Sequence, residues 1–149
     1  MGTAVAVDLR HWVERTYRTN GSWSYAGLSS GGFAAAYLPL LDPLPVHATC
    51  GLGGFYDGRI PPLAKAATLA QHRASAIAHA SRAPTLTYLA YGISDHSGPI
   101  QQTVEYTAAL HAAHKHVIVN ADAGGHTWVL WTEAFLQCFR TIEPAPHSA

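Results

Sequence analysis

Segments typical of strands alternate with segments typical of helices along most of the chain, and this alternation is the strongest constraint on its fold. Strand-like stretches, rich in β-branched and aromatic residues, occur at 22–28, 46–54, 85–92 and 116–122. Helix-like stretches, rich in alanine or with apolar residues at helical spacing, occur at 4–18, 31–41, 63–80, 98–114 and 127–140. Because strands joined by helices pair in parallel, we expect an α/β fold with about four parallel strands and helices on both faces.

The length of 149 residues supports one hydrophobic core and is short for two. We expect a single domain over residues 1–143 and a flexible, Pro-rich tail at 144–149. Asp8, Arg10 and Glu14 occur before any apolar stretch could form the core of a signal peptide. The expected location is therefore cytoplasmic by default, and a segment upstream of this chain would make it secreted or membrane-attached.

The balance of charges excludes one class of partner. The formal net charge is zero with histidine neutral, and charged residues make up 12% of the chain. A nucleic-acid-binding surface needs clustered Lys and Arg, so we expect no nucleic acid as partner. No uninterrupted apolar run is long enough to cross a bilayer. Cys50 and Cys138 do not have a paired zinc spacing, and the sequence leaves open whether they form a single disulfide.

The pentapeptide GLSSG stands between the first predicted strand and the helix that follows it. A serine nucleophile is often carried on such a turn, where small residues two before and two after the serine let strand and helix nearly touch. Gly27 and Gly31 fill these positions around Ser29, whereas a frame centred on Ser30 would place Leu28 at the first. We therefore predict that Ser29 is a nucleophile.

A serine hydroxyl is a poor nucleophile at neutral pH, so this prediction also requires an imidazole base and a carboxylate that orients it. Asp95 follows the third predicted strand and His126 the fourth, which places both at the carboxyl edge of a parallel sheet. The order Ser29, Asp95, His126 is that of hydrolases with a G-x-S-x-G turn. Asp57, after the second predicted strand, is a rival for the acid, or a turn residue beside Gly58.

Three motifs, AGLSSGGFAAA, YGISD and GGHTWVLW, together resemble the esterase D-like branch of the α/β-hydrolase superfamily, over almost the whole chain. That branch includes S-formylglutathione hydrolases, feruloyl esterases and antigen 85-type mycolyltransferases. The resemblance implies serine-dependent ester hydrolysis without a cofactor, with Ser29 as nucleophile, His126 as general base and Asp95 as acid. The alternatives are acyl transfer of the mycolyltransferase type, or a weak or inactive remnant that acts as an interaction module.

The chain departs from this family at its N-terminal side. Family members usually have several strands before the serine turn, and this chain begins only one predicted helix before it. The resemblance thus implies a truncated fold in which the backbone N–H of Ser30 is the one evident oxyanion-hole donor. The first predicted strand would have an unpaired edge, so we expect a homodimer that covers it. A truncated fold has a shallow, open site, which favours short-chain esters as substrates.

Other chemically capable residues have simpler interpretations. The histidines His111, His114 and His116 lack a cysteine or carboxylate to complete a metal site, so we interpret them as solvated and expect no metal. Asp122 is interpreted as structural. The aromatic residues of the last predicted helix are expected to face the core, and they are Trp128, Trp131, Phe135 and Phe139. The sequence does not decide between core and pocket for Tyr25, Phe55 and Tyr56.

Overall fold

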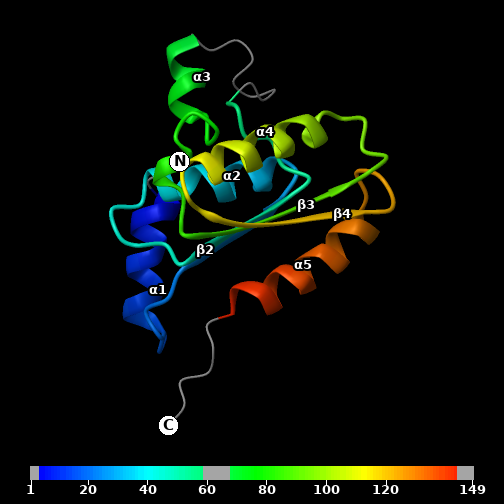
Figure 1. The fold of residues 1–149 in the computed structure, drawn as a ribbon. Helices are drawn as coiled ribbons and strands as arrows, with labels where there is room; N and C mark the ends of the chain where they lie inside the picture. The colour runs from blue at the N-terminus through cyan, green and yellow to red at the C-terminus, as the bar shows by residue number, and fades with distance from the viewer. Residues whose placement is uncertain (1–3, 59–67, 144–149) are drawn as a thin grey trace.

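A sheet of four parallel strands lies at the centre of the computed structural model, which describes residues 4–58 and 68–143 (Figure 1). The strands are β1 (Ser24–Leu28), β2 (Ala48–Leu52), β3 (Leu86–Gly92) and β4 (His116–Asp122). They lie side by side in the order β1-β2-β3-β4. The parallel α/β class predicted from the alternation of segments is confirmed. Within the described residues, β1 and β4 form the two edges of the sheet.

Helices cover both faces of this sheet. In chain order the described helices are η1 (Ala4–Leu9), which is π-helical and continues into α1 (Arg10–Thr16), then α2 (Ser30–Tyr37), α3 (Thr68–Ala74), α4 (Pro99–Ala112) and α5 (Trp128–Ile142). Of these, α2, α4 and α5 pack on the sheet. Short 3-10 turns are η2 (Leu38–Leu40) and η4 (Ala80–Arg82). Figure 1 shows α2 and α4 on one face and α5 on the other. Right-handed crossovers between successive neighbouring strands place the connecting helices on one face, and α5, after the last strand, covers the other.

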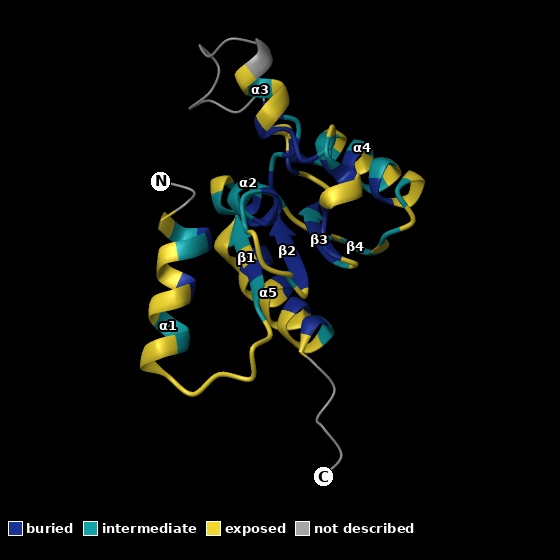
Figure 2. Ribbon diagram, turned by 90° about the vertical axis from the view of Figure 1, so that its left-hand side faces the viewer, coloured by how far each residue is buried: buried dark blue, intermediate teal, exposed yellow. Residues whose placement is uncertain are grey.

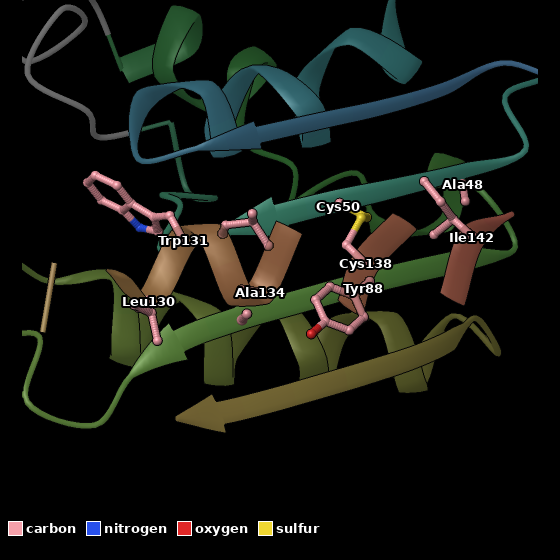
Figure 3. Packing of buried hydrophobic residues seen from close by; sticks show 10 residues of the cluster. Ala48, Cys50, Tyr88, Leu130, Trp131, Ala134, Cys138 and Ile142 are labelled. Atoms are coloured by element: carbon pink, nitrogen blue, oxygen red, sulfur yellow. A yellow bond between two sulfur atoms is a disulfide. The ribbon is translucent and has the colours of Figure 1, made fainter. Parts of the chain in front are cut away.

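Each face of the sheet has its own core. On the α5 side, β2 and β3 pack against one stripe of the helix, made of Leu130, Trp131, Ala134, Cys138 and Ile142 (Figure 3). The core on the opposite face joins β3 to α2 and α4. Every residue of β2 is buried, as the dark colour of this strand in Figure 2 shows. Full burial is expected of a central parallel strand that is covered on both faces.

A disulfide joins Cys50 of β2 to Cys138 of α5 across the core on that side (Figure 3). Both residues are fully buried, and their Cα atoms are 6.2 Å apart. The sequence left open whether these two cysteines form a disulfide, and the structure shows that they do. The bond fixes α5 against the strand next to β1, and α5 is the helix that follows the loop of His126.

The helix expected at 63–80 is wrong in its second half. The described part, α3, ends at Ala74, and residues 63–67 lie outside the described residues. The Ser75 hydroxyl oxygen accepts a hydrogen bond from the N–H of Ala78 at 3.1 Å, which competes with helical bonding. The N–H of Ile77 donates to a carbonyl in the loop after β2. Tertiary pairing therefore overrides the helix propensity of the alanines.

Two further expectations concern the ends and the surroundings of the chain. The predicted tail at 144–149 lies outside the described residues, and the single-domain assignment of 1–143 stays a prediction. No helix in the described ranges combines the length and the apolar character that crossing a membrane requires.

Candidate active site

Ser29 occupies the turn between β1 and α2 in a backbone conformation that side chains rarely adopt. Its φ is 54° and its ψ is −119°, which costs a non-glycine residue about 1–3 kcal/mol. The Ser29 N–H donates to the carbonyl of Leu52 in β2 at 2.8 Å. The Ser29 carbonyl accepts from the N–H groups of Gly32 and Phe33 in α2. The neighbouring strand and the following helix therefore hold the strained residue in place.

The close approach of β1 and α2 explains the glycine at position 27. A Cβ atom added to Gly27 would lie 2.1 Å from the carbonyl oxygen of Gly31. A Cβ on Gly31 itself meets no atom within 4 Å, so space does not require glycine there. The second tight contact is at Gly32, whose added Cβ would lie 2.8 Å from Cα of Gly54. The G-x-S-x-G pattern therefore identified one of the two close approaches and missed the other.

His126 reaches Ser29 from the loop between β4 and α5. Its Nε2 atom lies 2.9 Å from Oγ of Ser29, and its Nδ1 atom lies 2.6 Å from Oδ2 of Asp95. A carboxylate only accepts hydrogen bonds, so Nδ1 carries the proton and donates to Asp95. The lone pair of Nε2 is then free to accept the hydroxyl proton of Ser29. The structure thus brings the three predicted residues together in one hydrogen-bonded chain at the carboxyl edge of the sheet.

Backbone contacts tie the loop after β3 to the loop after β4. The N–H of Ile93 donates to the carbonyl of Asp122 at 2.9 Å, and the N–H of Ser94 donates to the carbonyl of Gly124 at 2.8 Å. A Cβ on Gly92 would lie 2.4 Å from the oxygen of Gly124, so the end of β3 needs glycine for this approach. The carboxylate and the imidazole that these loops carry are therefore held by backbone as well as by their own hydrogen bond.

The Asp95 carboxylate is buried and bonded through both oxygens. Its side chain is 1% exposed, and Oδ2 accepts from His126. Oδ1 accepts from the hydroxyl and from the backbone N–H of Ser97. Burial alone would raise the pKa of Asp95, but the hydrogen bonds from Ser97 and His126 outweigh it and hold the pKa below its usual value. Asp95 is therefore ionised at neutral pH and can stabilise a protonated His126.

Ser30 is the first residue of α2 and directly follows Ser29. Because Ser30 begins the helix, its backbone N–H has no hydrogen-bond acceptor within the helix. The N-terminal end of a helix also carries partial positive charge. This N–H is therefore suited to stabilise a negative charge that develops on a group bonded to Ser29 Oγ.

The carboxylate that bonds Nδ1 of the imidazole is that of Asp95. Asp57 follows β2, and its backbone N–H donates to a glutamine side chain of α4 at 3.1 Å. Asp122 ends β4, where its carboxylate accepts from an asparagine of the same strand at 3.3 Å. Its carbonyl also bonds to the loop after β3. These contacts agree with the structural role predicted for Asp122.

The aromatic residues of α5 divide between the core and the surface. Trp131 is 8% exposed, and its ring meets that of His126 edge to face, with centroids 4.7 Å apart and an angle of 85°. Trp128 is 70% exposed, and Phe135 and Phe139 also lie at the surface. The expectation that all four face the core is therefore wrong for three of them. The helix touches the sheet along a single stripe, and these three residues fall beside it.

The tyrosines that the sequence could not assign belong to the core. Tyr56 is fully buried and stacks on Tyr106 with ring centroids 4.8 Å apart. Burial raises the pKa of Tyr56 far above its usual value, so its hydroxyl stays neutral. Tyr25 is buried and donates to Asp42 at 2.8 Å. Phe55 is partly buried in the loop after β2.

The histidines expected to be solvated are exposed in the structure, at 111, 114 and 116. Across residues 4–58 and 68–143, no group of three His, Cys, Asp or Glu side chains is placed so that it could hold a metal ion.

Comparison by sequence finds no matching family model and no matching curated protein. Solved structures do match. A ferulic acid esterase has a TM-score of 0.71 at 19% identity, over 94% of this chain and 59% of that one. An S-formylglutathione hydrolase from Agrobacterium tumefaciens has a TM-score of 0.75 at 16% identity, over 95% and 57%. The capsule O-acetyltransferase of Neisseria meningitidis serogroup A has a TM-score of 0.67 at 12% identity, over 92% and 62%.

These similarities define the class of fold. The chain has the α/β-hydrolase fold in a truncated form, with four parallel strands. It spans about three fifths of the length of each of the three matched chains. The resemblance drawn from the three sequence motifs is confirmed at the level of the fold, since an S-formylglutathione hydrolase and a ferulic acid esterase are among the structural neighbours.

Two residues that shape the site were missed from the sequence. Ser97 donates twice to Asp95, and a signal for the backbone bond was available, because an aspartate in a turn commonly accepts from the backbone N–H two residues on. Trp131 packs on His126. Its place in the last helix predicted burial, but nothing in the sequence indicated that it would contact the imidazole.

Proposed function

We propose that the protein is a serine carboxylesterase that hydrolyses short-chain carboxylic esters through an acyl-enzyme on Ser29. The observation that supports this is the hydrogen-bonded chain from Ser29 Oγ through His126 to Asp95, with distances of 2.9 and 2.6 Å. An imidazole oriented by a buried carboxylate is what makes a serine hydroxyl nucleophilic. The strained turn at Ser29 supports the same conclusion, because strained residues concentrate at functional sites.

In the first half of the reaction, Oγ of Ser29 attacks the carbonyl carbon of the ester while Nε2 of His126 accepts the hydroxyl proton. The π electrons of the carbonyl move to its oxygen, which the N–H of Ser30 stabilises. The bond to the alcohol oxygen then breaks, and the imidazolium gives its proton to the departing alcohol. The acyl group remains on Ser29 as an ester.

In the second half, a water molecule attacks this ester and His126 accepts the proton of the water. The bond to Oγ breaks, the carboxylic acid leaves, and Ser29 recovers its proton from the imidazolium. Asp95 holds the imidazole in the required tautomer and stabilises its charged form without taking the proton. Its low pKa keeps it ionised throughout the cycle. Water is the co-reactant, and the mechanism requires no cofactor.

A second candidate function is acyl transfer to an alcohol. It is favoured by the capsule O-acetyltransferase, a transferase by name that shares this fold. In that case an alcohol takes the place of water in the second half of the reaction. A third candidate is a weak or inactive remnant that serves as an interaction module. Ser30 supplies one assigned oxyanion donor, and the loss of one such donor typically costs about 10²–10³ in rate.

The disulfide bears on the location of the protein. Disulfides persist in oxidising compartments and are rare in the cytosol. Because Cys50 and Cys138 are joined, we propose a location outside the cytoplasm instead of the cytoplasmic default.

Hydrolysis of p-nitrophenyl acetate by the wild type and two variants tests the proposed function. Ser29→Ala is expected to abolish turnover, because it removes the attacking oxygen. Ser81→Ala, a change at an exposed serine of η4, is the matched control and should retain the full rate. Turnover by Ser29→Ala at the wild-type rate rejects the assignment. An added alcohol that captures most of the acetyl group as a new ester favours the transferase. A folded wild-type protein without any turnover favours the inactive remnant.

A further inference from the structure

An apolar groove lies along α5 and reaches Leu28 at the end of β1, and we call it the α5 groove. Its volume is about 270 Å³, and its lining consists of Leu28, Trp128, Trp131, Thr132, Phe135 and Leu136. Leu28 directly precedes Ser29 in the chain, and the ring of Trp131 contacts that of His126. The groove lining therefore includes the residue that precedes Ser29 and the tryptophan that packs on His126.

The lining of the α5 groove offers apolar surface and almost no hydrogen-bonding capacity. None of its six side chains is charged. The hydroxyl of Thr132 already donates to the carbonyl of Trp128 at 2.9 Å. Trp128 is 70% exposed and Leu136 54% exposed, so large apolar side chains face solvent along the groove. A concave apolar surface with few polar groups is typical of a site for an apolar ligand.

We propose that the α5 groove binds the acyl chain of the ester and gives the protein a preference for longer acyl chains over acetyl. This proposal rests on the proposed function and refines it, because it favours the longer members of the short-chain class, up to about octanoyl, over acetyl. The acyl carbon becomes bonded to Ser29 Oγ and stays there through both half-reactions, next to Leu28 in the groove wall. The alcohol leaves after the first half-reaction and makes no contact during the second.

The size of the α5 groove sets the expected chain length. A groove of about 270 Å³ is larger than an acetyl group needs and has room for a chain of several carbons, so octanoyl serves as the test chain. A fully buried methylene group strengthens binding about fourfold. An open groove removes about half of the surface of the acyl chain from water, so each methylene group strengthens binding about twofold. From acetyl to octanoyl, kcat/KM is therefore expected to rise by about 60-fold.

Two ester series test this proposal. The first varies the acyl chain of p-nitrophenyl esters from two to about twelve carbons, and the second varies the alcohol chain of acetate esters over the same range. We expect kcat/KM to rise with acyl length to about eight carbons and then to level off. The alcohol series should remain flat. A flat acyl series, or a preference that follows the alcohol chain, overturns the proposal.

A matched pair of variants places the effect in the α5 groove. Leu136→Gln should lower the ratio of octanoate to acetate turnover by about tenfold, because it puts an amide in the groove wall. Val104→Gln is the control, since Val104 is 56% exposed on α4, which packs on the opposite face of the sheet. It should leave the ratio unchanged. Equal ratios in both variants contradict the proposal.

Binding measured without turnover separates this proposal from the proposed function. Acetate hydrolysis that depends on Ser29 but shows no acyl preference overturns only the groove. If no ester is hydrolysed, octanoate is titrated into Ser29→Ala. Its binding is followed by tryptophan fluorescence, because Trp128 lies in the groove wall. A saturable change that Leu136→Gln weakens supports the groove. No saturable change, or a change that is the same in Leu136→Gln, overturns it.

Discussion

The substitution Gly27→Ala tests the geometry of the serine turn more sharply than any other single change. The added Cβ would lie 2.1 Å from the carbonyl oxygen and 2.3 Å from the carbonyl carbon of Gly31. Real Cβ contacts stay above 3.0 Å, so strand and helix must separate by about 0.9 Å. Because the obstructing atoms are backbone, no side chain can rotate away. We expect a loss of about 3 kcal/mol in the free energy of unfolding, at the upper end for overpacking.

The same movement displaces Ser29, which lies between the two elements. A misplacement of about 1 Å at a reacting atom costs about 100-fold in rate, so labelling by a fluorophosphonate should slow by that factor. Urea unfolding and the labelling rate are measured together. Gly31→Ala is the matched control, because its Cβ meets no atom within 4 Å, and it should unfold and react like the wild type. Equal behaviour of the two variants would refute the explanation of the G-x-S-x-G pattern given above.

Three further predictions concern stability and assembly. Replacing Cys50 and Cys138 together by Ala should lower the free energy of unfolding by about 4.5 kcal/mol, because the disulfide closes a loop of 88 residues. The same urea unfolding tests the proposed single domain, which should unfold in one transition. Two free thiols in the denatured wild type would contradict the disulfide. The pKa of Asp95 is lower in the folded than in the unfolded chain, so its contribution to stability is complete above about pH 4 and is lost as the pH falls through the folded pKa. Asp95→Asn should therefore flatten acid unfolding below about pH 4, and an unchanged acid limb would contradict this. We also propose a homodimer that covers the open edge of β1, so light scattering should give twice the mass of the chain. Phe139 lines a cavity together with Ala26 of β1, and Phe139→Glu should therefore give the monomer. A wild-type protein that is monomeric at every concentration would contradict the homodimer.

The sequence was sufficient for the parts of the fold that depend on local patterns. Each predicted strand is present, because β-branched and aromatic runs such as 85–92 match buried parallel strands. Ser29, Asp95 and His126 were placed correctly at one edge, because the carboxyl ends of parallel strands meet there. Their roles in catalysis remain predictions.

Features that depend on contacts between distant segments could not be predicted in this way. The helix at 63–80 ends early because the N–H of Ile77 pairs with a carbonyl near β2, about twenty residues away. The exposure of Trp128 was missed because helical spacing predicts which residues share an apolar face, but not how much of that face the sheet covers. The link between Cys50 and Cys138 required the distance between β2 and α5, which no spacing in the sequence provides.

In the proposed function, the Ser29 hydroxyl is a nucleophile activated by His126. Mass spectrometry after treatment with a fluorophosphonate tests it most directly, because the reaction requires the nucleophile and its base together. We expect a single adduct on the peptide that contains Ser29, formed by the wild type and absent from Ser29→Ala and His126→Ala. A folded wild-type protein that forms no adduct, or an adduct on another residue that persists in Ser29→Ala, would contradict it.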